Sequence, residues 1–139
     1  MILYHYTKIN CLEKHGTILE EGLKPLDEPK DCIVPPFCGA VWFTTCEDYL
    51  WANGRIPECR VTCVIPSSDK RLVLWKKWLR ENLPAPEVAE VISMARETRA
   101  PWCYLWEAYY VYFGEVPLDY IRAVDARLYQ FNELTIFRR

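Results

Sequence analysis

The sequence predicts an α+β domain, with helices clustered in the first two thirds of the chain and strands dominating its end. Segments rich in β-branched and aromatic residues predict strands at 2–7, 108–116, 120–125 and 133–137. Apolar residues recur at helical spacing between the first of these segments and the last three. The chain has 139 residues and no internal repeat, so we expect a single domain over residues 1–139.

The first strand and the segment after it are the clearest local signals. The strand ILYHYT is expected to end near Thr7. A helix should follow, because Asn10 and Glu13 have the spacing of a capping box. Gly22 is placed to end this helix.

A loop, a buried strand and a second short helix are expected next. Residues 24–38 carry four prolines and no usable period, which predicts a long loop. The segment GAVWFTT, residues 39–45, predicts a short buried strand. Thr45 and Asp48 then have capping-box spacing for a helix that stops near Gly54.

The middle of the chain predicts one strand and two longer helices. Residues 59–65 alternate as a half-buried strand. Residues 69–82 predict an amphipathic helix, and residues 86–98 predict another after the break at Pro84 and Pro86. The apolar face of the first of these helices consists of Leu72, Trp75, Trp78 and Leu79.

Charge and cysteine content exclude several classes of protein. The formal net charge is −2, so no overall basic field attracts nucleic acid. No segment has the length and apolar character of a membrane span, and the N-terminus lacks the pattern of an export signal, so we expect a cytoplasmic protein. The seven cysteines are an odd number and lack the spacing of zinc sites, which favours reduced thiols and no metal.

Three short motifs carry the functional hypothesis. LYHYT places His5 within a strand, VWFTTCEDYL is an aromatic strand that leads into a helix, and WEAYYVYFGEVPLDYI opens a strand with the carboxylate of Glu107. Each of these residues taken alone has an ordinary structural explanation, as a strand histidine, a core aromatic residue or an exposed carboxylate. In this order the motifs resemble those of the ADP-ribosyltransferase fold, in particular its diphtheria-toxin-like and poly(ADP-ribose)-polymerase-like branch with small bacterial and phage toxins.

The resemblance implies a fold, a substrate and roles for particular residues. The fold would be a single domain of mixed antiparallel sheets with peripheral helices, and the substrate would be NAD. His5 would bond a ribose, the Tyr6 backbone would hold the nicotinamide carboxamide and Thr7 would support that grip. The aromatic walls would be Trp42, at the position of a family tyrosine, and Tyr49. Many members carry glycine where this chain has the bulkier Tyr6, and a tyrosine would narrow the nicotinamide end of the site.

Glu107 is the expected catalytic carboxylate, acting together with His5. Breaking the bond between ribose and nicotinamide builds positive charge on the ribose, and a carboxylate bonded to the 2′-hydroxyl stabilises that charge. Glu115 is the alternative carboxylate, although its place beside Gly114 suits a solvated turn. This chemistry needs no metal.

The function expected from the resemblance is transfer of ADP-ribose from NAD to a macromolecule, as a toxin or effector. The acceptor, protein or nucleic acid, stays open. Two alternatives are a non-catalytic module that binds a nucleotide or a protein, and an enzyme similar to RNA 2′-phosphotransferases. The basic residues Lys70, Arg71, Lys76, Lys77 and Arg80 are interpreted as a solvated helix face and not as a nucleic-acid site.

Overall fold

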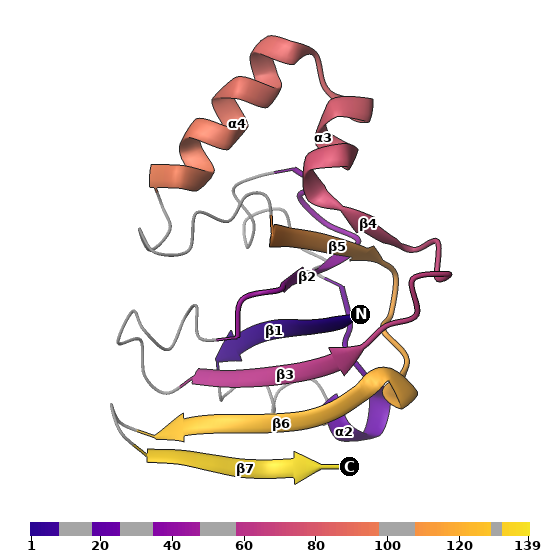
Figure 1. The fold of residues 1–139 in the computed structure, drawn as a ribbon, viewed down its shortest axis with the longest axis vertical. Helices are drawn as coiled ribbons and strands as arrows, with labels where there is room; N and C mark the ends of the chain where they lie inside the picture. Colours follow the sequence, from indigo (N-terminus) through magenta and orange to yellow (C-terminus); the bar gives the residue numbers. More distant parts are fainter. Residues whose placement is uncertain (9–17, 26–34, 48–57, 98–107, 129–131) are drawn as a thin grey trace.

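An antiparallel sheet organises the molecule in the computed structural model, which describes residues 1–8, 18–25, 35–47, 58–97, 108–128 and 132–139. The described strands form one seven-stranded sheet in the order β4-β5-β2-β1-β3-β6-β7 (Figure 1). The strands are β1 (Ile2–Lys8), β2 (Ala40–Thr44), β3 (Glu58–Val64), β4 (Leu72–Leu74), β5 (Tyr109–Phe113), β6 (Ile121–Leu128) and β7 (Asn132–Arg138). The α+β class is therefore confirmed, and the described strands form a single sheet instead of several.

Helices cover parts of this sheet. They are α2 (Ile18–Glu21), α3 (Trp75–Asn82), α4 (Ala85–Glu97) and the 3-10 helix η4 (Leu118–Tyr120). The pair α3 and α4 lies beyond β4 and β5 at one end of the sheet, and α2 lies near β6 at the other end (Figure 1). Within the described residues, none of the helices has the length and apolar character that crossing a membrane would require.

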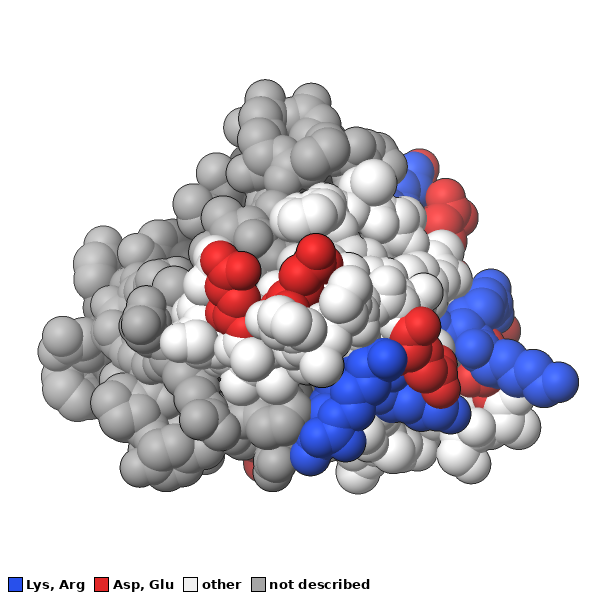
Figure 2. Space-filling model, turned by 90° about the horizontal axis from the view of Figure 1, so that it is seen from above, with Lys and Arg blue, Asp and Glu red and all other residues white. Residues whose placement is uncertain are grey.

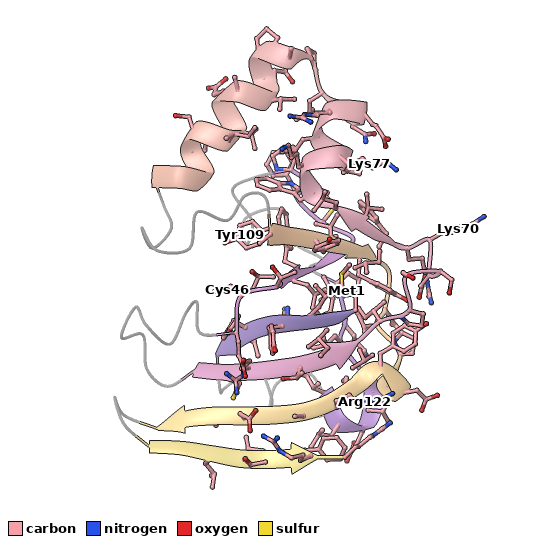
Figure 3. The ribbon with its side chains drawn as sticks, in the orientation of Figure 1. Met1, Cys46, Lys70, Lys77, Tyr109 and Arg122 are labelled. Carbon is pink, nitrogen blue, oxygen red and sulfur yellow. The ribbon has the colours of Figure 1, made fainter. Side chains whose placement is uncertain are left out.

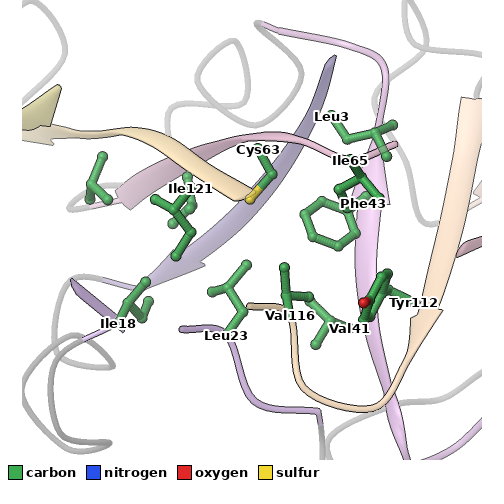
Figure 4. Close-up of a cluster of buried hydrophobic side chains, with 12 residues drawn as sticks. Leu3, Ile18, Leu23, Val41, Phe43, Cys63, Ile65, Tyr112, Val116 and Ile121 are labelled. Carbon is green, nitrogen blue, oxygen red and sulfur yellow. The ribbon is translucent and has the colours of Figure 1, made fainter. Parts of the chain in front are cut away.

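Two apolar clusters lie on opposite faces of the sheet. The larger one unites β1, β2, β3 and β5 with α2 and with the bridge between Leu23 and Val116 (Figure 4). The smaller one packs Trp75 and Leu79 of α3 against Tyr109 and Val111 of β5. Each cluster removes side chains from water, which is the main favourable term in folding. Successive residues of β2 therefore alternate between the two clusters.

Gly22 ends α2 as expected from the sequence. Its φ is 80°, a conformation that favours glycine, and its N–H donates to the carbonyl of Ile18 at 2.9 Å. A Cβ atom at this position would lie 2.2 Å from the carbonyl oxygen of Val116. Glycine is thus required both by the backbone angle and by the close approach of the chain after β5.

The helix predicted over residues 69–82 is wrong in its first part. Leu72–Leu74 forms strand β4, and the helix α3 begins at Trp75. The reason is tertiary, because β5 offers an open edge on which Val73 pairs with Val111. The predicted strands at 2–7, 39–45 and 59–65 correspond to β1, β2 and β3, and the three C-terminal strands and the helix at 86–98 are also present. Most of the helix expected after Asn10, and of that expected after Asp48, lies outside the described residues.

Candidate functional site

The strands of the three motifs are neighbours in the sheet. LYHYT lies on β1, AVWFT is β2 and YYVYF is β5, and these strands are consecutive in the order β5-β2-β1. Thr44 at the end of β2 pairs with Tyr4 on one side and with Tyr109 on the other. Segments more than sixty residues apart in the sequence are thereby brought side by side (Figure 1).

His5 is held in one orientation at the junction of β1 and β2. Its Nδ1 lies 2.8 Å from the carbonyl oxygen of Trp42, and its ring meets the ring of Phe43 edge-on, with centroids 5.9 Å apart. Because a carbonyl oxygen only accepts, the Nδ1 atom must carry the hydrogen of the neutral ring. The Nε2 atom is then an acceptor, and no described residue bonds to it.

The pKa of His5 is lowered from its ordinary value of 6.5. Burial is the larger cause, since it disfavours the charged ring, and the bond to the carbonyl of Trp42 opposes the shift. At neutral pH the ring is therefore uncharged. Such a ring can accept a hydrogen bond from a hydroxyl group through Nε2.

Trp42 and His5 present their side chains on opposite faces of the sheet. The ring of Trp42 packs edge-on against Trp75 and Tyr109, with centroid distances of 5.3 and 6.2 Å, in the cluster beneath α3. The His5 ring instead contacts Phe43, the next residue along β2, which must point the other way. A ligand lying on the His5 face would not stack on the Trp42 ring.

Tyr110 is an aromatic residue that the sequence reasoning missed. It pairs directly with Phe43, so it shares the face of His5, and it is half-buried at the margin of the larger cluster. Phe43 itself is 1% exposed and can only support its neighbours. The segments VWFTT and YYVYF are continuous apolar and aromatic runs, so only the register between β2 and β5 identifies Tyr110. The His5 face thus offers His5, Thr7 and Tyr110 as partly buried side chains around a fully buried phenylalanine.

Tyr6 points away from His5 and engages the chain that leaves β2. Its hydroxyl donates to the carbonyl oxygen of Cys46 at 3.1 Å and also contacts the carbonyl oxygen of Glu47. Figure 3 shows Cys46 at this end of β2. The bulk of Tyr6 therefore does not project onto the face of His5.

Of the two candidate carboxylates, only Glu115 belongs to the described residues. Glu107 and Tyr49 fall outside them, and their predicted roles stay predictions. The residue after Glu107, Ala108, accepts a hydrogen bond from the N–H of Thr45 at 3.2 Å, so the chain entering β5 lies beside the end of β2. Glu115 is exposed in the turn after β5, at the opposite end of that strand.

A second polar cluster surrounds Asp69, in the turn before β4. One carboxylate oxygen accepts from the hydroxyls of Tyr112 at 2.7 Å and Tyr120 at 3.0 Å, and the other accepts from the N–H of Arg71 at 3.1 Å. The guanidinium of Arg71 holds the pKa of Asp69 below its ordinary value of 3.8, and burial raises the pKa of Tyr112. A carboxylate with all these donors is a structural anchor and has little capacity left for a ligand.

Cysteines and basic residues give no further site. The described cysteines form no disulfide, and no group of three metal-ligating residues occurs in the described part of the chain. Burial raises the pKa of Cys63 to about 12, which makes this thiol inert at neutral pH. On the surface over α3, acidic side chains lie among the basic ones (Figure 2), and Lys77 faces Glu81 at 3.9 Å.

Comparisons with known proteins identify no protein similar to this chain. No family model, no curated protein and no solved structure matches the chain. The chemistry of the site rests on its own side chains, which are an uncharged histidine whose Nε2 atom bonds to no residue of the described part of the chain, a hydroxyl and a partly buried tyrosine. These groups suit a ligand with hydroxyls and a flat ring.

Proposed function

We propose that this protein is an NAD-dependent ADP-ribosyltransferase that modifies a macromolecular acceptor. The observation that carries the proposal is the adjacency of β1, β2 and β5, the three strands whose sequences resemble the motifs of that fold. A chance resemblance of three short segments would not require them to be neighbours in one sheet.

In this proposal the His5 face receives the nicotinamide end of NAD. The Nε2 atom of His5 accepts a bond from a ribose hydroxyl, because Nδ1 is already committed to the carbonyl of Trp42. Thr7 supports the ribose or the carboxamide. Tyr110, rather than Trp42, supplies the aromatic contact to the nicotinamide ring, since it shares the face of His5.

The reaction would break the bond between the ribose C1′ atom and the nicotinamide nitrogen. Nicotinamide leaves as a neutral ring, a nucleophilic atom of the acceptor bonds to C1′ and the acceptor loses a proton. The carboxylate of Glu107 is the group assigned to stabilise the positive ribose in the transition state, where a fixed negative charge is most effective. Glu107 precedes β5 by two residues in the sequence.

Release of nicotinamide from NAD tests the proposal, measured with and without a cell lysate as a source of acceptor. Glu107→Gln removes only the charge and should lower the rate by about a hundredfold or more. Glu115→Gln is the matched control, and because Glu115 is exposed in a turn its rate should stay within about twofold of the unchanged protein. Thermal unfolding of both variants would show that they are folded.

Two outcomes would overturn the proposal. One is a folded protein that releases no nicotinamide under any of these conditions. The other is a Glu107→Gln variant that keeps its rate. Binding of NAD without release would replace the transferase with a nucleotide-binding module on the same scaffold.

A further inference from the structure

The junction between β1 and β2 is the weakest backbone connection inside the sheet. Only the pair Tyr4 and Thr44 joins these two strands. By contrast, β1 and β3 pair continuously from Ile2 with Val64 to Lys8 with Glu58. We call this junction the seam, and it divides the sheet into the halves β4-β5-β2 and β1-β3-β6-β7.

Side chains of β1 make hydrogen bonds across the seam, where backbone pairing is sparse. On one face the imidazole of His5 bonds the carbonyl of Trp42. On the other face the hydroxyl of Tyr6 bonds the carbonyl of Cys46 at 3.1 Å and contacts that of Glu47. Two successive residues of β1 thus reach across the seam toward β2 on opposite faces of the sheet.

Arg60 of β3 reinforces the contact made by Tyr6. It pairs with Tyr6 in the sheet, and its guanidinium donates to the same carbonyl of Glu47 at 3.2 Å. It also faces the Glu47 carboxylate at 3.8 Å. The bonds from Tyr6 and Arg60 therefore converge on the two residues that follow β2.

A buried carboxylate keeps the Arg60 guanidinium in place. Asp125 of β6 is fully buried and lies 3.3 Å from Arg60, which is 6% exposed. Thr135 of β7 donates to the other oxygen of Asp125 at 3.0 Å. A charged donor anchored in this way loses little entropy when it binds a carbonyl, so it makes a stiff contact.

We propose that Tyr6 and Arg60 are positioning residues that clamp Cys46 and Glu47 across the seam, and so keep β2 and His5 in the arrangement that binds NAD. This inference rests on the proposed function, because NAD is the ligand whose binding the clamp would favour. Loss of the clamp would populate an open seam. A protein whose competent state is only partly populated binds its ligand more weakly in proportion.

The clamp is tested first without reference to activity. Tyr6→Phe removes one hydroxyl and keeps the ring, and the half-exposed thiol of Cys46 reports on opening of the seam. Loss of one hydrogen bond should shift the opening equilibrium of the seam by about fivefold. This shift is divided between the open and the competent fraction, so labelling of Cys46 by a maleimide, followed by peptide mass spectrometry, should become about twofold faster. Arg60→Lys keeps a positive charge beside Asp125 and should change labelling in the same direction.

Tyr120→Phe is the matched control. It also removes one tyrosine hydroxyl bond, here to Asp69 at 3.0 Å, at a site away from the seam. It should leave the labelling rate of Cys46 unchanged. Equal labelling in the unchanged protein and the Tyr6→Phe variant would overturn the clamp.

The positioning role is tested by steady-state kinetics of nicotinamide release. Tyr6→Phe should raise the KM for NAD by about twofold or more and leave kcat nearly unchanged, because the clamp controls the fraction of competent protein. Faster labelling with an unchanged KM would overturn the positioning role. A lowered kcat with an unchanged KM would overturn it too, because Tyr6 would then act in the chemical step.

The failures of the two proposals are distinguishable. If the unchanged protein binds no NAD and releases no nicotinamide, the proposed function fails and takes the positioning role with it. The labelling of Cys46 in Tyr6→Phe and Tyr120→Phe still decides whether the clamp exists.

Discussion

The two halves of the sheet are stabilised in different ways. In β1-β3-β6-β7, long antiparallel ladders surround the buried ion pair of Arg60 and Asp125. In β4-β5-β2, shorter strands depend on an aromatic cluster in which Trp42, Trp75 and Tyr109 meet edge to edge. A single backbone pair joins the halves. Backbone pairing is thus continuous within each half and sparse at the seam, where His5 lies.

The largest effect on stability is expected from Asp125→Ala, which removes the carboxylate of the ion pair in the half β1-β3-β6-β7. The substitution leaves the buried guanidinium of Arg60 without its carboxylate and should lower the free energy of unfolding by about 3 to 5 kcal/mol. Chemical denaturation measures the loss. Hydrogen exchange should show it first in β6 and β7, and equal loosening of α3 and α4 would contradict the division into two halves.

Trp75→Phe tests the aromatic half. The indole N–H donates to the carbonyl of Pro35 at 2.7 Å, and the ring is fully buried between β2, β5 and α3. Loss of this bond and of part of the ring should cost about 2 kcal/mol. In a denaturation experiment combined with hydrogen exchange, protection should fall in α3 and α4, while β6 and β7 stay protected near the global limit.

Asp69→Asn tests the anchor that ties the turn before β4 to β5 and η4. The amide cannot accept from all the groups that now bond the carboxylate, and we expect a loss of about 1 to 2 kcal/mol. The lowered pKa of Asp69 also makes this stabilisation depend on pH. The stabilisation is present above the ordinary value of 3.8 and is lost as the pH falls below it. Denaturation at pH 7 and near pH 3 should therefore show a smaller difference between the variant and the unchanged protein at the lower pH.

The smallest effect is expected from the protonation of His5 at the seam. Its pKa is lowered by burial, so the unfolded chain takes up a proton more readily than the folded protein. Stability should be unaffected above pH 6.5 and should decline as the pH falls from 6.5 to the lowered pKa of the folded state. A His5→Gln variant should lose this slope in denaturation series at different pH, and an unchanged slope would assign it to another group.

Local patterns in the sequence predicted most of the elements. Strand-forming residues identified β1, a short apolar run identified β2, alternation identified β3 and the apolar spacing identified α3 and α4, because all of these are properties of neighbouring residues. Gly22 was predicted as a helix end for the same reason, since the backbone angle at the end of a helix favours glycine.

The arrangement of the candidate site required the tertiary structure. The family resemblance implied Trp42 as an aromatic wall for nicotinamide, whereas the structure packs Trp42 against Trp75 and places Phe43 and Tyr110 on the face of His5. Which of two successive aromatic residues faces a ligand depends on which face of the sheet the helices cover, and no local pattern contains that information.

The sequence by itself thus determined the α+β class, the strands that carry the motifs and the residue types available for binding. Only the tertiary structure decided the order of the strands, the conversion of Leu72–Leu74 into β4, and the pairing of Arg60 with Asp125 across sixty-five positions. The physical reason is that pairing across a sheet and burial of charge are contacts between distant segments. Their energies depend on which groups meet after the chain has folded.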